Sequence, residues 1–312
     1  MTTRPRTDGK IFVVSRDYGQ FDDTVDEAVK RQFPDTVSYG ASDIGALEGD
    51  AVMNPARDVI GEFGRRYGLG NGLDIYIESN ISRTGGMSSS TGLSCSLWGA
   101  LSQQVRHTVT KDEFWGIAYP VNVKVHGGAA SGAEIHSSVH GGYHKVRIDR
   151  SSGKPVAVAQ KLAGIAPCTL IVGNSGVRTQ TRKTVPYVAE GRRNDTASYE
   201  AVFTQIGLLT EKATGLFESG DLSGVGSCMD EDHELLAREL GVSHPKLNRM
   251  ARAAKNAGAF GAKMAGGGKG GIIIALANPD TEWDVTHAIQ MVGAEEVYKT
   301  VLGGEGLKIE EG

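Results

Sequence analysis

The chain has 312 residues, and its 33 Lys and Arg against 37 Asp and Glu leave a formal net charge of −4. The basic residues are scattered, which argues against a nucleic-acid-binding surface, and the longest strongly apolar run, 272–277, is too short to span a bilayer. The 3 cysteines are widely spaced without a C-x-x-C pattern, and the N-terminus lacks the apolar core of a signal peptide. We therefore expect a cytoplasmic protein that binds neither nucleic acid nor membrane.

Hydrophobic periodicity along the chain predicts a mixed protein of the α+β class. A chain of 312 residues is long enough for one large or two modest domains. We predict strands at 11–14, 73–77, 144–148, 156–159, 169–172 and 272–276. We predict helices at 54–67, 93–105, 112–118, 197–218, 222–240, 245–257 and 283–292.

A loop of small residues, Gly-Gly-Met-Ser-Ser-Ser-Thr-Gly at 85–92, lies between the strand predicted at 73–77 and the helix predicted at 93–105. This order favours an anion cradle, because glycines let the backbone approach a phosphate and the first N–H groups of a helix point at it. Serine hydroxyls can donate to phosphate oxygens or bind a magnesium ion. The alternative, from this loop alone, is a flexible turn that caps a helix.

A second loop, Lys-Met-Ala-Gly-Gly-Gly-Lys-Gly-Gly at 263–271, follows the helix predicted at 245–257 and precedes the strand predicted at 272–276. Its run of glycines suits close backbone approach to a ligand or to another loop, and Lys269 could add positive charge. Neither loop fits the Walker pattern G-x-x-x-x-G-K-[ST] or the dinucleotide pattern G-x-G-x-x-G, so nucleotide binding on those two folds is disfavoured.

The two loops together resemble the second and third motifs of the GHMP kinase superfamily, P-x-x-x-G-L-G-S-S-A-A and K-x-T-G-A-G-G-G-G. A further stretch, 125–142, contains His-Gly-Gly-Ala-Ala-Ser-Gly-Ala-Glu and is similar to the mevalonate kinase pattern H-G-x-P-S-G-x-D-N. The first predicted strand, with Lys10 before it, is similar to the family's G-K-V-x-L. The resemblance covers residues 10–276, nearly the whole chain, and the mevalonate kinases match best within the superfamily.

This resemblance implies a two-lobed GHMP kinase fold with the active site in the cleft between the lobes. The N-terminal, ATP-binding lobe would be ribosomal-protein-S5-like and span 1–165, and the C-terminal lobe would be ferredoxin-like and span 166–312. The implied activity is ATP-dependent phosphorylation of a small-molecule hydroxyl, with mevalonate favoured as acceptor and 5-phosphomevalonate, an intermediate of isoprenoid biosynthesis, as product. It implies ATP and Mg2+ as cofactors, a small-molecule substrate as partner, and a homodimer as in many relatives.

The same resemblance assigns roles to individual residues. Lys10 and Glu134 would flank the acceptor hydroxyl as the catalytic pair. The residues expected to bind the nucleotide are Gly85, Gly86, Ser88, Ser89, Ser90, Thr91, Gly266, Gly267 and Gly268, with Ser90 holding Mg2+ through ATP. The residues expected to bind the substrate are His126, Ser131, Gly132 and Thr181.

Departures from the family pattern leave other functions open. Glu134 stands where the family has an aspartate, and Asn122 stands where it has a magnesium-binding glutamate, although a neutral amide is the weaker ligand. Ser88 replaces the middle glycine of the first loop. The alternatives are another GHMP enzyme (a phosphomevalonate, homoserine or sugar kinase, or a relative of diphosphomevalonate decarboxylase) and a catalytically silent sensor that binds a nucleotide or metabolite.

Overall fold

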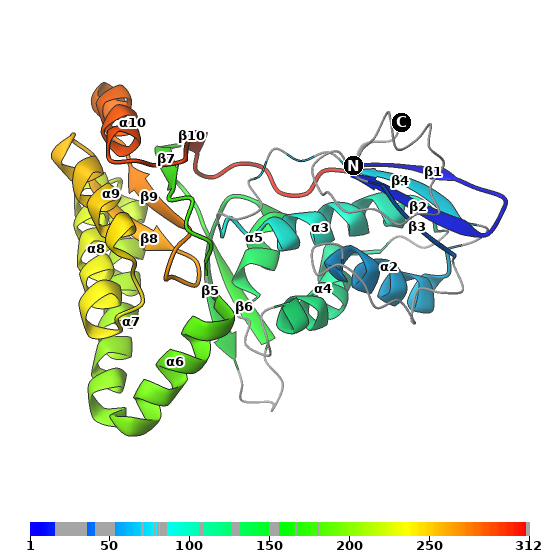
Figure 1. The fold of residues 1–312 in the computed structure, drawn as a ribbon, viewed down its shortest axis with the longest axis horizontal. Coiled ribbons are helices and arrows are strands. Elements are labelled where there is room, and N and C mark those ends of the chain that lie inside the picture. The colour runs from blue at the N-terminus through cyan, green and yellow to red at the C-terminus, as the bar shows by residue number, and fades with distance from the viewer. Residues whose placement is uncertain are drawn as a thin grey trace. The chain divides into compact units, whose positions relative to one another are not determined.

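The computed structural model describes residues 1–15, 36–40, 54–69, 72–77, 79, 81, 86–105, 109–125, 132–149, 156–165, 167–179 and 181–309. Helices and sheets occur together, as predicted for the α+β class (Figure 1). The strands are β1 (Thr2–Pro5), β2 (Lys10–Ser15), β3 (Thr36–Gly40), β4 (Leu73–Ile77), β5 (Tyr143–Asp149), β6 (Val156–Leu162), β7 (Thr169–Asn174), β8 (Gly261–Ala265), β9 (Ile272–Leu276) and β10 (Glu296–Val301). The helices are α2 (Asn54–Tyr67), α3 (Ser89–Ser102), α4 (Lys111–Val125), α5 (Ala133–His140), α6 (Thr181–Asn194), α7 (Thr196–Ser219), α8 (Leu222–Glu234), α9 (Pro245–Asn256) and α10 (Glu282–Met291).

Several elements have the predicted bounds, and others need correction: the helix predicted at 112–118, for example, is α4 and extends to Val125. The helix at 54–67 and the strands at 73–77 and 272–276 are confirmed as α2, β4 and β9. The helix predicted at 222–240 ends at Glu234, where a π-helical turn, Leu235–Glu239, follows. The loop predicted at 263–271 was wrong at its start, because residues 263–265 belong to β8 and pair with β9.

The chain divides into two compact units, each with many contacts within itself. The first comprises Met1–Ile81, Ser89–Gly141 and Glu305–Gly312, and the second comprises Ser82–Ser88 and Gly142–Gly304. The hairpin of β5 and β6, which the sequence placed in the N-terminal lobe, belongs to the second unit. The predicted lobe boundary after residue 165 stays a prediction. A division by contacts places a hairpin in the unit that it contacts most, and this need not be the lobe to which it belongs by topology.

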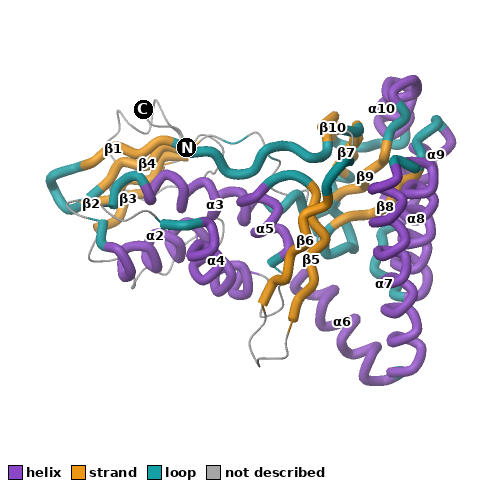
Figure 2. Tube along the Cα trace, turned by 180° about the vertical axis from the view of Figure 1, so that it is seen from behind, coloured by secondary structure: helices purple, strands orange, loops and turns teal. Residues whose placement is uncertain are grey.

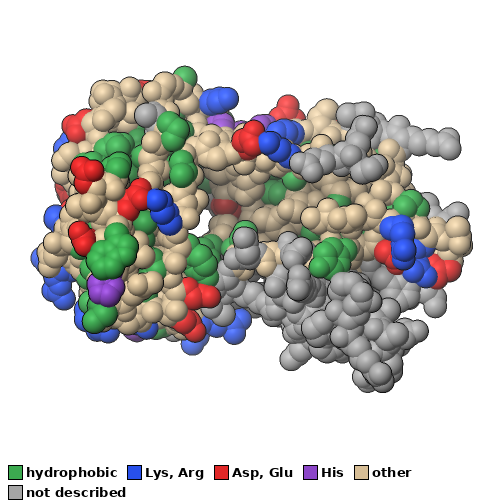
Figure 3. Space-filling model, turned by 90° about the horizontal axis from the view of Figure 1, so that it is seen from above, with side chains coloured by type: hydrophobic (Ala, Val, Ile, Leu, Met, Phe, Trp, Pro, Cys, Tyr) green, Lys and Arg blue, Asp and Glu red, His purple; other side chains and the backbone are tan. Residues whose placement is uncertain are grey.

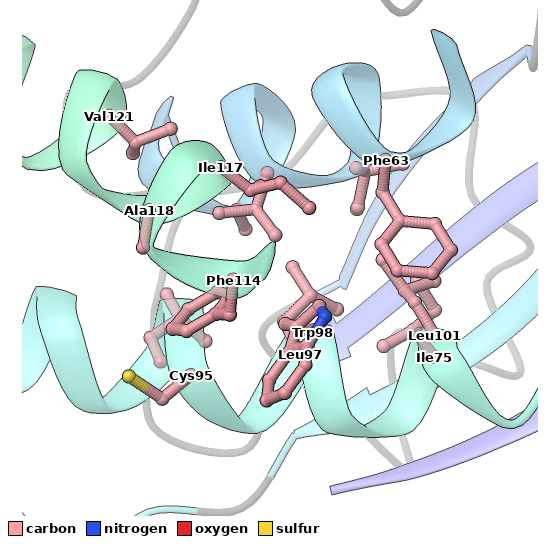
Figure 4. Close-up of a cluster of buried hydrophobic side chains, with 14 of the residues drawn as sticks. Phe63, Ile75, Cys95, Leu97, Trp98, Leu101, Phe114, Ile117, Ala118 and Val121 are labelled. Atoms are coloured by element: carbon pink, nitrogen blue, oxygen red, sulfur yellow. The ribbon is translucent and has the colours of Figure 1, made fainter. Parts of the chain in front are cut away.

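In the first unit, helices α2, α3 and α4 pack with a four-stranded sheet. The strand order is β1-β4-β2-β3, with β2 parallel to β4 and the other neighbours antiparallel. Alternate residues of β4, Leu73, Ile75 and Ile77, are buried, as their spacing dictates for one face of a sheet. In the same core the Trp98 and Phe114 rings stack with centroids 4.4 Å apart (Figure 4). This core holds in place the helices that carry several candidate residues.

In the second unit, the sheet order is β10-β7-β9-β8, and all its neighbouring strands are antiparallel. Helices α8 and α9 pack on β8, and α10 packs on β7 (Figure 2). Met250, Ile273 and Ile289 are fully buried in the core between the helices and the sheet. The turn between β8 and β9 carries the second glycine loop.

None of the helices in the described ranges is long and apolar enough to cross a membrane. On the face shown in Figure 3, acidic and basic side chains are interspersed.

Candidate functional site

The first small-residue loop turns into α3 through a serine with a glycine-like backbone. Ser88 has φ 53, in the left-handed region that side chains disfavour, and Gly86 has φ 70. Helix α3 starts at Ser89, earlier than the predicted residue 93, so residues 89–91 lie in its first turn. This turn has no acidic side chain, and its N–H groups have no intrahelical acceptor, so it can bind an anion. Gly85 lies outside the described residues.

The second loop lies against the first. A Cβ on Gly266 would be 3.3 Å from the carbonyl oxygen of Gly86, so the two glycine loops meet within the second unit. Gly268 has φ 79, and a Cβ there would be 2.3 Å from the carbonyl oxygen of Val242. Glycine is therefore required at 268 by the backbone of the protein itself, and approach to another loop, one of the two predicted uses of these glycines, is observed. Gly267 lies between these two contacts.

A third segment, next to Thr179, holds the second loop in place. The Thr179 hydroxyl donates to the carbonyl of Gly268 at 3.2 Å, and the Ser175 hydroxyl donates to the carbonyl of Gly271 at 2.6 Å. A Cβ on Gly86 would be 3.8 Å from Cγ2 of Thr179, so this threonine faces both loops. Thr179 is not among the residues that the sequence predicted for the site.

Lys269, expected to add positive charge for a ligand, is engaged with the protein. Its ammonium group donates to the carbonyl of Gly241 and lies 5.3 Å from the centroid of the Tyr187 ring. Its backbone has φ 57, and its N–H donates to the carbonyl of Val242 at 2.7 Å. In this conformation Lys269 anchors the second glycine loop to Gly241 and Val242, which follow the π-helical turn.

In the first unit, a carboxylate, an amide and a hydroxyl meet beside the start of α3. Glu134 lies in the first turn of α5, Asn122 lies in α4, and Thr91 lies in the first turn of α3. The amide nitrogen of Asn122 donates to the Thr91 hydroxyl oxygen at 3.0 Å and to Oε1 of Glu134 at 3.2 Å. Asn122 is only 5% exposed, and its Oδ1 has no hydrogen-bond partner among the described residues. The predicted catalytic carboxylate is thus tied to the helix that follows the first loop.

Cys95 lies close to this cluster but supplies no nucleophile. Burial raises the pKa of the Cys95 thiol to about 12, and the charge of Glu134 adds to that rise. The thiol is therefore protonated at neutral pH and acts as a small apolar side chain.

The other predicted catalytic and substrate residues are placed only in part. Lys10 begins β2, and Thr181 begins α6; their side chains are not among those described. Gly132 precedes α5 with φ 71, where a Cβ would overlap the Trp115 ring at 2.3 Å. The absence of a side chain at 132 thus lets an aromatic ring pack against the start of the helix that carries Glu134. His126 and Ser131 lie outside the described residues.

A magnesium ion would find oxygen donors here rather than a closed protein cage. Within the described ranges, no group of three His, Cys, Asp or Glu side chains could hold a metal. Ser90 at the head of α3, the carboxylate of Glu134 and the buried oxygen of Asn122 are the hard donors that Mg2+ prefers. Such a set fits a metal that is held mainly by the phosphates of a bound nucleotide.

Comparison with known proteins gives concordant matches in sequence and in fold. The family model for the GHMP kinases N terminal domain matches residues 54–142, and the model for GHMP kinases C terminal matches residues 213–293. The chain is 30% identical to a mevalonate kinase of Thermococcus gammatolerans, over 89% of this chain and 81% of that protein. It is 31% identical to a mevalonate kinase of Pyrococcus horikoshii, over 77% of this chain and 69% of that protein.

Solved structures with different acceptors resemble this fold equally well. L. major mevalonate kinase in complex with R-mevalonate matches with a TM-score of 0.73 and 20% identity, over 96% of this chain and 87% of that chain. Lactococcus lactis galactokinase complexed with galactose matches with a TM-score of 0.73 and 18% identity, over 99% of this chain and 86% of that chain. The fold alone therefore does not select the acceptor.

Proposed function

Since this chain belongs to the GHMP kinase superfamily of small-molecule kinases, we propose that it transfers the γ-phosphoryl group of ATP to the 5-hydroxyl of mevalonate. The product would be 5-phosphomevalonate, an intermediate of isoprenoid biosynthesis. The observation that carries the choice of acceptor is the identity to curated mevalonate kinases over most of the chain. Membership in the superfamily, with both family models matched, accords with the α+β GHMP kinase fold predicted from the sequence.

The two glycine loops and the start of α3 would bind the triphosphate. Gly86 and Gly266 bring the loops together, and the first turn of α3 adds free N–H groups at the positive end of the helix. Phosphoryl transfer involves little covalent work by the protein, so positioning and neutralisation of phosphate charge supply most of the catalysis. Gly85, Ser88, Ser89, Ser90, Thr91, Gly267 and Gly268 complete the proposed set.

Lys10 and Glu134 would act on the acceptor hydroxyl. Glu134 would orient the hydroxyl and accept its proton, while Lys10 would lower the proton affinity of the hydroxyl. The glutamate is one methylene longer than the family's aspartate, so its reach depends on what holds it. His126, Ser131, Gly132 and Thr181 are the proposed substrate residues.

Magnesium, when bound with ATP, would neutralise phosphate charge, and Ser90 is the residue proposed to hold it. The neutral Asn122 does not supply the second negative ligand of the family pattern. A location in the cytoplasm and a homodimer remain predictions.

The first test is a substrate panel. Purified protein is incubated with ATP, Mg2+ and, separately, mevalonate, its 5-phosphate, its 5-diphosphate, homoserine and galactose, and ADP and carbon dioxide are measured. We expect ADP release with mevalonate and no carbon dioxide. Release with another acceptor would move the chain to a sister activity, carbon dioxide would indicate the decarboxylase, and ATP binding without any turnover would indicate a sensor.

The catalytic pair is tested by Lys10→Met and Glu134→Gln. We expect each substitution to abolish turnover while the Kd for ATP changes by less than about threefold, because the nucleotide is held by other residues. Turnover and ATP affinity are measured on the same preparations. Wild-type rates in both variants would remove the pair from the mechanism.

A further inference from the structure

We propose that Asn122 is a positioning residue that orients the Glu134 carboxylate for the reaction by tying it to Thr91 at the head of α3. This inference deepens the proposed function and rests on it for its kinetic part. The residue lies in α4, and its two partners lie in α5 and α3, so one side chain links three helices of the first unit.

The geometry of the amide fixes both partners at once. An Asn NH2 group has two donors in one plane, and here they are directed to the Thr91 hydroxyl oxygen at 3.0 Å and to Oε1 of Glu134 at 3.2 Å. The orientation of the amide follows from the network, because the opposite orientation would set its oxygen against the carboxylate. At 5% exposure the amide is also held by packing, so it cannot turn away into solvent.

A donor at position 122 is what a longer carboxylate requires. Glu134 has one more rotatable bond than an aspartate, so without an anchor its carboxylate is spread over more rotamers. A charge-assisted hydrogen bond from a rigid neighbour selects one of them. A displacement of about 1 Å in a group that orients a substrate can lower the rate about 100-fold.

The hydrogen bond to Thr91 connects the Glu134 carboxylate, through Asn122, with the helix that is proposed to bind the nucleotide. Thr91 lies in the first turn of α3, directly after the loop that meets the second glycine loop. The amide therefore relates the position of the acceptor-orienting group to the position of the helix that would bind the phosphates. Neither residue type nor sequence spacing alone predicts this link.

The first experiment compares Asn122→Leu with a matched control. Leu removes both donors at similar volume, and we expect kcat to fall about 100-fold while KM for ATP changes by less than about threefold. Gln104→Leu is the control, because the Gln104 amide also donates to a threonine hydroxyl, that of Thr3, at 2.9 Å in the same unit. We expect the control to change neither parameter by more than about twofold.

A double-mutant cycle separates positioning from a general structural role. Glu134→Asp shortens the side chain and removes the contact with the amide, so Asn122→Leu should lower kcat by less than about threefold in that background. Equal losses in the two backgrounds, or a loss confined to KM for ATP, would overturn the proposal. Should Asn122→Leu fail to fold, Asn122→Ser takes its place; its hydroxyl cannot reach both partners, and an undiminished kcat would overturn the proposal.

The same double-mutant cycle can be measured by urea unfolding, and that measurement does not depend on which acceptor the enzyme uses. The midpoint shifts of Asn122→Leu and Glu134→Asp should be non-additive, with the double variant shifted less than the sum, because either substitution alone breaks the link. Non-additive midpoints together with no mevalonate turnover in the wild type would contradict the proposed function but support the hydrogen bond between Asn122 and Glu134. Additive midpoints would remove the link itself, and with it the positioning role, whatever the acceptor.

Discussion

At the scale of single residues, Gly132 shows how a position that resembles a family motif also has a demanding structural role. Its φ of 71 is left-handed, and a Cβ would lie 2.3 Å from Cη2 of Trp115 and 3.0 Å from Cδ2 of Tyr119. These two rings stack with centroids 5.0 Å apart. The glycine therefore lets the stacked pair close over the start of α5, which carries Glu134.

We expect Gly132→Ala to lower the free energy of unfolding by about 3 kcal/mol, because backbone strain and overlap with the Trp115 ring act together. Gly68→Ala is the matched control: Gly68 has φ 74 in the same unit, but a Cβ there meets nothing within 4 Å. The control isolates the backbone cost, about 1 kcal/mol. Urea unfolding of both variants measures the difference, and equal losses would show that the ring overlap is relieved without cost.

Ser88 makes the complementary point about a departure from a family pattern. The family has glycine there, and Ser88 adopts φ 53, the backbone that glycine adopts most easily. Ser88 thus holds a left-handed backbone at some cost in strain, and it presents an exposed hydroxyl beside α3.

At the scale of elements, His233 joins α8 to the strand that leads into the second glycine loop. Its Nδ1 accepts the backbone N–H of Met264 in β8 at 3.1 Å, and the side chain is 6% exposed. Burial lowers the pKa of His233 from 6.5, and the charge of Lys263 adds to the fall, while Glu234, Asp230 and a hydrogen bond that the protonated ring can donate to Asn248 act in the opposite direction. The native state therefore holds this imidazole neutral as an acceptor.

Stability should then depend on pH through this contact. The unfolded chain takes up a proton near pH 6.5 and the native state takes it up only at lower pH, so the contribution is present above 6.5 and lost as the pH falls. We expect the urea midpoint of the wild type to fall more between pH 7.5 and pH 5.5 than that of His233→Asn, whose amide oxygen can accept the same N–H. Because both proteins contain the other titrating groups, the difference between them isolates the contribution of His233. Equal falls of the urea midpoint with pH would contradict a role for His233 in the pH dependence.

Elements with strong local patterns could be predicted, and elements that depend on partners could not. Strands β4 and β9 have alternating or continuous apolar residues and were predicted with their bounds. Strands β1 and β10 are largely exposed edge strands, with too few apolar residues to show a period, and were not predicted. Helix α6 contains Pro186 and few apolar residues, so its pattern reads as a loop.

The candidate site divides in the same way. Unusual composition marked the two glycine loops, and the structure brings Gly86 and Gly266 together. The contact from Asn122 to Glu134 depends on how α4 and α5 pack, and no local pattern encodes it. Sequence comparison with the family marked Asn122 as an altered metal ligand; the structure shows its amide nitrogen as a donor to the carboxylate.

At the scale of the whole molecule, the chain crosses between its two compact units more than once. Residues Ser82–Ser88 belong to the second unit, although the chain before and after them belongs to the first, and the first unit is completed by Glu305–Gly312. The first loop thus lies with the second glycine loop, whereas the helix that follows it lies with Glu134.

The division near the C-terminal end can be tested with two leucines placed close together in the sequence. Leu307 packs with the core of the first unit, donates its N–H to the carbonyls of Ser138 and Val139, and lies 3.1 Å from where a Cβ on Gly99 would be. Leu302 packs in the second unit and donates its N–H to the carbonyl of Cys168 at 2.9 Å.

We expect Leu307→Ala and Leu302→Ala each to cost about 1 to 2 kcal/mol, less than a fully buried leucine, because both side chains are half-buried. The losses should appear in different places, since each leucine supports one core. Amide hydrogen exchange should speed up in α3 and α5 for Leu307→Ala, and in β7 and β9 for Leu302→Ala. If either substitution loosened both sets of amides equally, the two units would be opening as one cooperative body, and the separate cores would not act as separate units of stability.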